Sequence, residues 1–587
     1  MAANTFGRIP VTVIQIDQDL CCKVYAGTNA CGTCNADEGQ PCYNTFATCQ
    51  SKEDYTLGDP LTLSFSMPQT DQVCSEYLIP SVTGVNTEPG RINVAGRNSR
   101  DKPLGKRAKV SVRLTDHPHS DNFVDPYLSQ RNFVPFDRGT FWGKWLKRNP
   151  FYNGRPLRVL EGFAGQTLAE MDARHYVINA INGPDSRGNV TIIADDILAL
   201  ADDKKAQAPA LSTGILLADI DETVTTLTVT GGALSQYNSY STSAIRIGDE
   251  VIRYTGLTVN GSGDLVFSGL TRGSDNTEAQ SHDAEDTVQA CLEYIQVRAD
   301  QVAYDILTNF GNIDPDFIDL NEWNEQGVTW LDQFVVTRLI TEPVGVTTLI
   351  GQLAEQCLFY IWWDDYNQKI RLRAVAPFFG EVPLIDEDCN LLQNSVSVKA
   401  SPELRANEVW VSYIPKDPTV KGDSNEDFRR TAARLDTELS SVFAYNERQV
   451  YQINSPWLIN NLQVDLVSFR LLERYKNTPL YIKFDLDLKD EDLYLGDVFD
   501  ITFRGFTDET GLSIAVRYQV ISRHVVDGSV IKYEAQKFDF DVGALFGRWM
   551  ASDAPTYANA TEEQKANGAW WADADGLIDG DDGYTWA

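Results

Sequence analysis

The sequence is poor in histidine and lacks the common catalytic signatures. Only five histidines occur among its 587 residues. It contains no H-E-x-x-H zinc motif, no G-x-S-x-G nucleophile turn, no P-loop and no dinucleotide fingerprint following a strand. Pairs of carboxylates are uninformative, because the chain has 83 aspartates and glutamates. Nothing in the sequence supports catalysis, and we expect a protein that is not an enzyme.

Long apolar segments are also absent. No stretch approaches the ~20 apolar residues that a membrane-spanning helix needs, so we expect no stable insertion into a membrane. The segment Met1–Ile16 shows no basic leader followed by an apolar core, which is the pattern of a secretory signal. We therefore expect the chain to fold where thiols stay reduced.

Positive charge is scarce relative to negative charge. The formal net charge is -33, and the acids are spread along the chain. Such a surface repels nucleic acid and anionic membranes, which argues against sequence-specific binding of nucleic acid. The same charge would suit a wall past which DNA slides without sticking.

Cysteine is concentrated in one segment. Six of the ten cysteines lie between Cys21 and Cys49, in the pattern C-C-x8-C-x2-C-x7-C-x6-C. No histidine is near, so a metal held here would have only thiolate ligands. Zinc sites favour two close C-x2-C pairs, iron–sulfur clusters tolerate irregular spacing, and disulfides need an oxidising compartment. The residues alone leave all three open. The isolated cysteines, which we expect to be buried thiols, are Cys74, Cys291, Cys357 and Cys389.

Alternation of apolar and polar residues predicts a fold that is mainly β, in an α+β, multidomain chain. The expected strands of a first series are Arg107–His117, Arg155–Phe163, His175–Ile181 and Asn189–Asp196. A compact β unit built on a hairpin follows, around Ile245–Tyr254. We interpret it as a structural insertion, because its polar residues sit at turn positions.

The clearest local pattern lies in the middle of the chain. Apolar residues from Leu349 to Cys357 fall on one face of a helix, followed by a hairpin with its turn at Asp364–Asn367. Trp362 and Trp363 on that hairpin are expected in the core and at its rim. A second series of strands follows to Phe540, with an expected helix around Phe428–Leu439.

Two weaker metal candidates have simpler interpretations. His117 and His119 flank Pro118 after a strand, and a solvated turn is the simpler interpretation of this pair. The acidic stretch Asp573–Gly583 hints at a calcium loop but lacks the ligand ladder and closing glutamate of an EF-hand. We expect a surface-docked or flexible tail there.

Several motifs together resemble the tail-tip hub (baseplate hub) proteins of long-tailed bacteriophages and gene transfer agents. They occur in order along most of the chain up to about Phe540, and none is as specific as a catalytic signature. The motifs are IDQDLC (Ile16–Cys21), CYNTFATCQ (Cys42–Gln50), GTFWGKWLKRNPFYNGRPLRVLEGF (Gly139–Phe163), IRIGDEVIRYTG…LTRGS…H (Ile245–His282), LIGQLAEQCLFYIWWDD…KIRLRA (Leu349–Ala374) and LGDVFDITF (Leu495–Phe503).

The resemblance implies a structural virion protein. It would be a homotrimer at the distal end of the tail, assembled in the host bacterial cytoplasm, that adapts a sixfold tail tube to a threefold tip and lets DNA pass. Its partners would be a distal tail or tail-tube protein, a tape-measure protein, and tail-tip or fibre proteins. Each chain would carry two tail-tube-like β-barrel or sandwich domains, so that three chains present six.

On this basis the sequence divides into six parts. The expected parts are a cysteine-rich lobe (1–60), a first tube-like β domain (61–203), a linker with a small inserted β module (204–292), a helix-hairpin connector (293–395), a second tube-like β domain (396–545) and an acidic tail (546–587).

Some hub proteins carry an iron–sulfur cluster in a cysteine-rich lobe. Carried over by position, the resemblance implies the ligands Cys21, Cys31, Cys42 and Cys49, for a cluster of the 4Fe–4S kind with a structural role. The extra cysteines Cys22 and Cys34 could replace a neighbour, and zinc is the alternative metal. The competing interpretations of the whole chain are a secreted or surface β adhesin that binds glycans, and an iron–sulfur redox enzyme.

Overall fold

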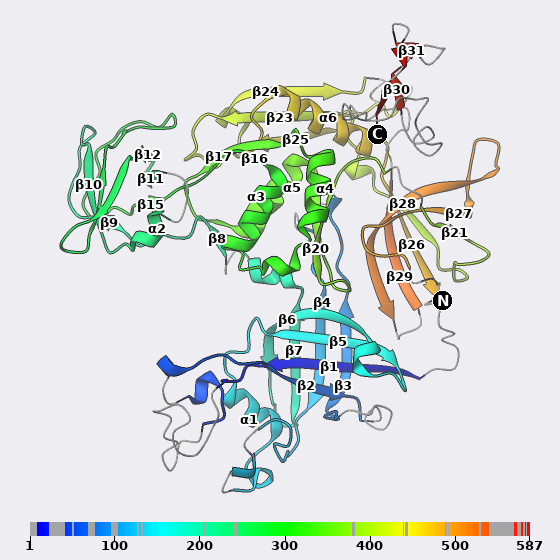
Figure 1. The fold of residues 1–587 in the computed structure, drawn as a ribbon. Helices are drawn as coiled ribbons and strands as arrows, with labels where there is room; N and C mark the ends of the chain where they lie inside the picture. The colour runs from blue at the N-terminus through cyan, green and yellow to red at the C-terminus, as the bar shows by residue number, and fades with distance from the viewer. Residues whose placement is uncertain are drawn as a thin grey trace.

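The computed structural model is mainly β, as the sequence predicts. Figure 1 shows the first large sheet at the bottom, helices in the middle, a small β module at the left and a second large sheet at the right. None of the helices in the described part is long and apolar enough to cross a membrane. The structure describes residues 9–22, 42–49, 52–68, 77–94, 104–125, 128–130, 133–202, 206–238, 243–378, 382–437, 440, 444–487, 490, 492–526, 530–538, 569–571, 577–578, 581–582 and 584–586.

A seven-stranded antiparallel sheet occupies the N-terminal third of the chain. Its strands, in spatial order, are β2 (Leu61–Ser66), β1 (Pro10–Gln18), β5 (Pro156–Phe163), β6 (Asp172–Asn182), β7 (Asn189–Asp195), β4 (Lys109–Thr115) and β3 (Val82–Glu88). In β4, Val110, Val112 and Leu114 are buried and alternate with more exposed residues. This period-2 pattern predicted the strand, and the four strands expected between residues 107 and 196 are confirmed.

The strand β1 differs from the expected division of the chain. It lies within 1–60, which we expected to be a separate lobe, but it pairs with both β2 and β5. Val13, Ile14 and Ile16 are fully buried in the sheet. The sheet therefore begins before residue 60, and the cysteine segment is a connection between two of its adjacent strands. Local sequence could not show this, because the pairing joins β1 to a strand more than a hundred residues away.

The small β module consists of two short sheets around a core of their own. The predicted hairpin is confirmed as β11 paired with β12, where Gly248 in the connecting turn has φ +56°, a conformation that favours glycine. The elements are β9 (Ile215–Leu216), β10 (Thr226–Thr230), α2 (Leu234–Asn238), β11 (Ala244–Ile247), β12 (Glu250–Arg253), β13 (Gly256–Val259), β14 (Leu265–Ser268) and β15 (Gln289–Ala290).

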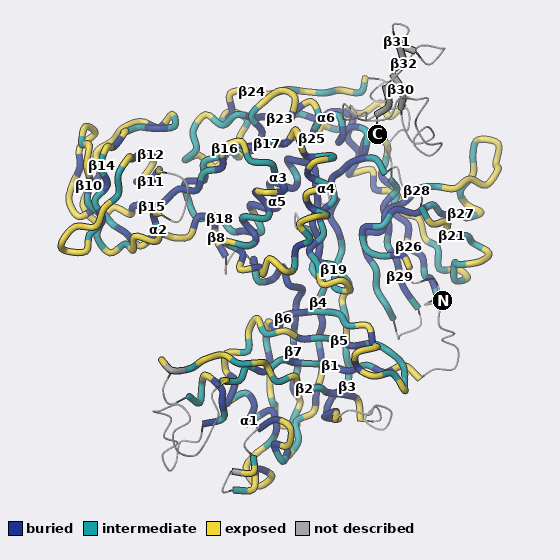
Figure 2. Tube along the Cα trace, in the orientation of Figure 1, coloured by how far each residue is buried: buried dark blue, intermediate teal, exposed yellow. Residues whose placement is uncertain are grey.

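The largest hydrophobic core surrounds the central helices, where buried segments converge in Figure 2. The predicted helix and hairpin are confirmed: Leu358, with φ 55°, ends the helix α5 and turns the chain into β19. Cys357, Trp362 and Trp363 are buried, as expected. The elements are β8 (Gln207–Ala208), β16 (Leu292–Arg298), α3 (Ala299–Asp305), α4 (Leu320–Trp330), β17 (Val335–Ile340), β18 (Val344–Gly345), α5 (Val346–Cys357), β19 (Phe359–Asp364) and β20 (Lys369–Ala374).

A three-stranded sheet and a long helix pack on this central core. The sheet has the order β24 (Phe428–Leu435), β23 (Glu408–Pro415), β25 (Val450–Ser455), and α6 (Asn461–Tyr475) lies against it. The expected helix around Phe428–Leu439 is wrong, because β24 is an extended strand paired with β23. Its alanines and arginines favour a helix locally, but pairing with a neighbouring strand overrides that preference.

The second large sheet has six strands. They are, in spatial order, β21 (Leu384–Asp386), β27 (Val498–Thr507), β28 (Ser513–Val526), β29 (Val530–Lys537), β26 (Leu480–Asp487) and β22 (Ser397–Ala400). The expected unit 396–545 is therefore shared between this sheet and the three-stranded sheet on the central core. Within the described residues both large sheets are open, with separate edge strands, and neither closes into a barrel.

Little of the C-terminal tail is described. Its short strands are β30 (Ala569–Trp571), β31 (Leu577–Ile578), β32 (Asp581–Asp582) and β33 (Tyr584–Trp586). The strands β31 and β32 pair with each other. Most of the acidic stretch 573–583 lies outside the described residues, so the possible calcium loop stays untested.

Candidate functional site

The two described ends of the cysteine segment, Cys21–Cys22 and Cys42–Cys49, meet at one loop beside the first sheet. The N–H of Cys21, which follows β1, donates to the carbonyl oxygen of Asn44 at 2.7 Å. The N–H of Asn44 in turn donates to Sγ of Cys42 at 3.3 Å. Asn44 has φ 59°, a left-handed conformation that asparagine tolerates better than most residues. The loop thereby brings Cys21 and Cys42 to the same turn.

Cys49 lies on the other side of the same loop, directly after the short 3₁₀ helix η1 (Phe46–Thr48). Burial raises the pKa of Tyr55 to about 12, and the neighbouring Asp19, Cys21 and Cys49 add to this rise. Cys21 and Cys49 are therefore both close enough to the Tyr55 phenol to act on it electrostatically. The structure places three of the four expected ligands around one loop.

The three described cysteines are of the right type for an all-thiolate metal site, but they do not form a complete set of four ligands. Cys31 and the possible substitute Cys34 lie outside the described residues. In the part of the chain that the structure describes, no group of three or more His, Cys, Asp or Glu side chains is arranged to hold a metal. The ligand set thus stays a prediction, while the nearest histidine in sequence is His117, far beyond this segment.

The helix α1 (Phe141–Arg148) contacts the cysteine loop through its last residue, Arg148. The guanidinium of Arg148 lies over the ring of Tyr43, 3.9 Å from its centroid, in a cation–π contact. Asp121 is buried and accepts hydrogen bonds from Nη2 of Arg148 at 2.7 Å and from Nζ of Lys144 at 2.6 Å. Burial by itself would raise the pKa of Asp121, but hydrogen bonds with its neighbours outweigh it and lower the pKa. A chain of contacts thus runs from Asp121 through Arg148 to the residue after Cys42.

The two histidines before this helix are not a solvated turn, which corrects the sequence interpretation. His119 is 6% exposed. Its Nδ1 accepts from the N–H of Asp121 at 2.9 Å, and its Nε2 lies 3.2 Å from the hydroxyl of Tyr77. His117 stacks on Phe141. Both ring nitrogens of His119 are engaged by the protein, so the pair is not built as a metal site.

A second feature is the junction between the two large sheets. The segment after β3 runs alongside β28, where the N–H of Ile92 donates to the carbonyl oxygen of Ile521 at 2.9 Å. The hydroxyl of Ser522 donates to the carbonyl oxygen of Gly90 at 2.8 Å. Ile92 and Ile521 belong to the central hydrophobic core. The junction is therefore both hydrogen-bonded and packed.

The hairpin β19–β20 connects the central core to the first sheet at the same junction. Nε1 of Trp363 donates to the carbonyl oxygen of His175 in β6 at 3.2 Å, and the hydroxyl of Tyr366 donates to Asp172 at 3.2 Å. On its other side, the Tyr360 hydroxyl accepts a hydrogen bond from Gln519 in β28. The hairpin thus contacts both large sheets.

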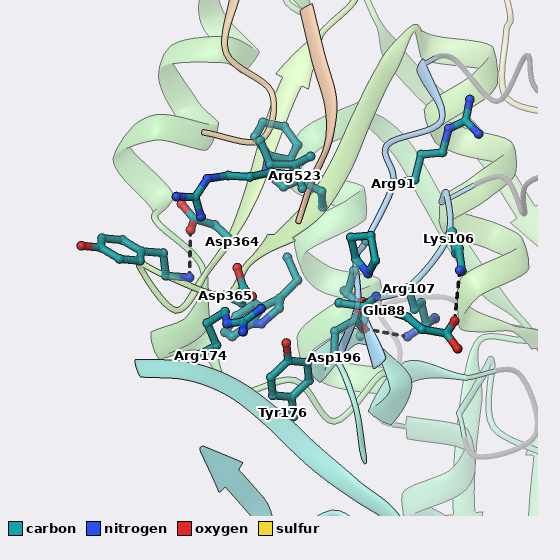
Figure 3. A pocket seen from close by; sticks show the side chains of 18 of the residues that line it. Glu88, Arg91, Lys106, Arg107, Arg174, Tyr176, Asp196, Asp364, Asp365 and Arg523 are labelled. Atoms are coloured by element: carbon teal, nitrogen blue, oxygen red, sulfur yellow. Dashed lines mark hydrogen bonds and ion pairs between the residues drawn. The ribbon is translucent and has the colours of Figure 1, made fainter. Parts of the chain in front are cut away.

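A polar cleft of about 900 Å³, open to solvent, lies where these three parts meet. Figure 3 shows charged side chains from both sheets and from the hairpin gathered around it. Sequence reasoning missed it. A signal was present in the run from Arg91 to Lys109, where seven of 19 residues are lysine or arginine in an otherwise acidic chain. The lining cations are Arg91, Lys106, Arg107, Arg174 and Arg523, and the lining acids are Glu88, Asp196, Asp364 and Asp365.

The small β module contains a buried carboxylate that sequence reasoning also missed. Glu250 is fully buried and accepts two hydrogen bonds from Arg272, at 2.8 and 2.7 Å. His282 contacts the same carboxylate at 2.8 Å, and the N–H groups of Gly273 and Gln280 donate at 2.8 and 3.1 Å. Through these hydrogen bonds, the carboxylate in strand β12 holds the long loop that follows β14. This role is structural, in agreement with the interpretation of the module as a structural insertion.

Comparison with known proteins gives likeness in structure only. No family model and no curated protein matches the sequence. The structure is similar to a 43 kDa prophage tail protein from Shewanella oneidensis, with 9% identity, 78% of this chain and 98% of that chain covered, and a TM-score of 0.34. It is also similar to a tail protein from Neisseria meningitidis, with 8% identity, 73% of this chain and 88% of that chain covered, and a TM-score of 0.33. A third similar structure is a chain of a native gene transfer agent virion, with 12% identity, 56% of this chain and 85% of that chain covered, and a TM-score of 0.30.

Proposed function

We propose that this protein is a structural hub of a phage-like tail, a homotrimer at the distal end of the tail tube. The observation that carries the proposal is the pair of large, mainly antiparallel sheets in one chain, fixed to each other through Ile92 and Ile521. Three chains with two such sheets each would offer six units to a sixfold tube and three to a threefold tip. Rings of different symmetry dock only when one of them repeats its interface in this way.

The charge of the chain supports passage of DNA through such a ring. A net charge of -33 disfavours binding of phosphate backbones, because no counterions are released in compensation. A lumen lined by acids would let DNA slide without arrest. The protein acts in this proposal as a conduit and adaptor and not as an enzyme. Its neighbours in the virion would be the tail-tube protein, the tape-measure protein, and the tip or fibre proteins.

We further propose that the cysteine segment holds an iron–sulfur cluster through Cys21, Cys31, Cys42 and Cys49. Cys21, Cys42 and Cys49 lie at or beside one short loop, but among the described residues their side chains are not grouped as metal ligands, and zinc is the alternative. Bound there, the cluster would supply covalent cross-links between segments that share little apolar core. The chain itself holds the loop through the contact of Arg148 with Tyr43 and through the turn at Asn44.

Native mass spectrometry of the full-length protein tests the assembly. A trimer is expected, and it should bind end-on to tail-tube rings in electron micrographs. A protein that stays monomeric at every concentration, and also when tail-tube protein is added, contradicts the hub proposal.

Spectroscopy and metal analysis of anaerobically purified protein test the cluster independently of the assembly. We expect a brown protein with broad absorbance near about 400 nm and acid-labile sulfide. Cys42→Ser should remove iron, whereas Cys389→Ser, an exposed cysteine outside the segment, should retain it. A colourless protein with one zinc per chain would select the alternative metal, and a protein with neither metal would refute the site.

A further inference from the structure

The cleft at the junction of the two large sheets gathers cations in an otherwise acidic chain. Five cations and four acids line it in a chain whose net charge is -33. Two of the cations are paired with lining acids: Lys106 with Glu88 at 3.1 Å and Arg107 with Asp196 at 3.5 Å. The first of these pairs is about half exposed and contributes little to stability.

Of the other three cations, Arg91 pairs with Glu534 at 3.2 Å. The guanidinium groups of Arg174 and Arg523 are less well satisfied. Arg174 comes from β6 of the first sheet, and Arg523 comes from β28 of the second. Arg174 places Nη2 at 2.7 Å from Glu161, but its buried Nε has no hydrogen-bond acceptor among the described residues. The same is true of Nε of Arg523 and of Nε1 of Trp362, which lines the cleft and is 7% exposed. Each buried donor left without an acceptor destabilises the fold, because it has lost its hydrogen bond to water.

Asp365, at the turn of the hairpin, is the acid that faces both arginines. Figure 3 shows its side chain beside Arg174, and the side chain of Asp364 beside Arg523. Burial raises the pKa of Asp365, although both arginines act in the opposite direction. Its carboxylate accepts no hydrogen bond from Nε of either arginine in the described structure. Arg174 and Arg523 therefore each keep a buried Nε donor without an acceptor among the described residues.

We propose that this cleft binds an oxyanion, a carboxylate or phosphate group, between Arg174 and Arg523, with Nε1 of Trp362 as a further donor. Guanidinium groups suit planar or tetrahedral oxyanions, because they donate two parallel hydrogen bonds. Tyr366 and Tyr494 supply aromatic walls to the cleft. Because the donors come from different sheets, the bound anion would also join the two sheets.

Isothermal titration of the full-length protein tests the site, with sodium malonate as the carboxylate probe and inorganic phosphate as the second probe. Sodium chloride holds the ionic strength constant, so that a general salt effect is subtracted. We expect saturable binding of one anion per chain with a dissociation constant in the range of about 1 mM or below. The probe that binds more tightly identifies the source of the oxyanion.

The double variant R174Q/R523Q should weaken binding at least about tenfold, because it removes two charge-assisted donors. The single variant R523Q, which leaves the Arg174–Glu161 pair intact, should weaken binding severalfold and guards against loss of folding in the double variant. Arg504→Gln is the matched control, since that side chain is 78% exposed and lies on a distant part of the second sheet. Absence of saturable binding by the natural sequence overturns the proposal, as does equal binding by R523Q or by a folded R174Q/R523Q protein.

Discussion

The N–H of Ile92 donates to the carbonyl oxygen of Ile521 at 2.9 Å, and this hydrogen bond joins the two large sheets. The register of β28 against β29 skips Ile521, because Val520 pairs with Ala535 and Ser522 pairs with Glu534. Ile521 is therefore a bulged residue whose carbonyl group is not used by β29. Bulges commonly redirect a backbone group in this way. Here the redirected carbonyl group of Ile521 accepts the hydrogen bond from Ile92.

This joint should weaken when the Ile92 donor is removed. Ile92→Pro abolishes the N–H and leaves the buried Ile521 carbonyl group unsatisfied, at a cost of about 2 kcal/mol beyond the loss of side-chain packing. Hydrogen–deuterium exchange should then show faster exchange of amides in β28 than in the natural protein. Ile92→Val keeps the N–H and should cost only about 1 kcal/mol. Equal exchange in both variants would show that packing alone holds the joint.

The small β module should depend on its buried carboxylate. Glu250→Gln leaves the buried guanidinium of Arg272 without a counter-charge, and breaking such a pair typically costs about 3–5 kcal/mol. Asp249→Asn is the matched control, because Asp249 is 81% exposed and should change stability by less than about 0.5 kcal/mol. Scanning calorimetry of the full-length protein should show a low-temperature transition for Glu250→Gln only.

The contribution of Glu250 also has a defined pH dependence. Burial raises its pKa, but hydrogen bonds from Arg272, Gly273 and His282 outweigh this, and the folded-state pKa lies below the ordinary value of 4.5. The stabilisation is therefore complete above pH 4.5 and is lost as the pH falls through the lower, folded-state value. The difference in melting temperature between natural protein and Glu250→Gln should shrink on acidification. A constant difference down to full protonation would contradict the assignment.

His175 should destabilise the first sheet in mild acid. Burial, assisted by the charge of Arg158, lowers the pKa of His175 to about 4 from 6.5. The folded state thus binds fewer protons than the unfolded chain, so stability is complete above pH 6.5 and falls as the pH drops toward 4. His175→Gln should flatten the melting temperature between pH 7 and pH 5 relative to the natural protein, and an unchanged slope would count against this origin.

The cysteine loop should loosen when its cation–π support is removed. Arg148→Lys keeps a positive charge near Asp121 but loses the planar group over Tyr43. Metal-free protein treated with iodoacetamide should then be alkylated several-fold faster at Cys42, which is 9% exposed in the native loop. The exposed Lys147, changed to Gln, provides the control and should leave the labelling rate unchanged. Mass spectrometry of the peptide that contains Cys42 gives both rates.

Much of the local structure could be predicted from sequence, because its causes are local. Alternation specified β4, and apolar spacing specified α5 together with the turn into β19. The prediction failed for β24, where local composition favours a helix but the neighbouring β23 supplies a pairing edge. It also separated β1 from its sheet, since no local signal tells a strand which distant strand it will join.

The candidate site divides in the same way. The cysteine spacing indicated a shared site, and the structure brings Cys21, Cys42 and Cys49 to one loop, although their ligand role stays a prediction. The supporting groups could not be predicted. Local sequence gives no sign that Asp121 and Glu250 are buried. Their partners Lys144, Arg148 and Arg272 come from elsewhere in the chain and compensate their charge.

The sequence by itself determined the elements that depend on short-range periodicity, the acidic surface and the clustering of thiols. Only the tertiary structure decided which strands share a sheet, that a bulge at Ile521 receives Ile92, and that Arg174 and Arg523 face one cleft. The reason is physical: pairing, burial and charge compensation depend on residues far apart in the chain, and their energies exist only once the chain has brought those residues together.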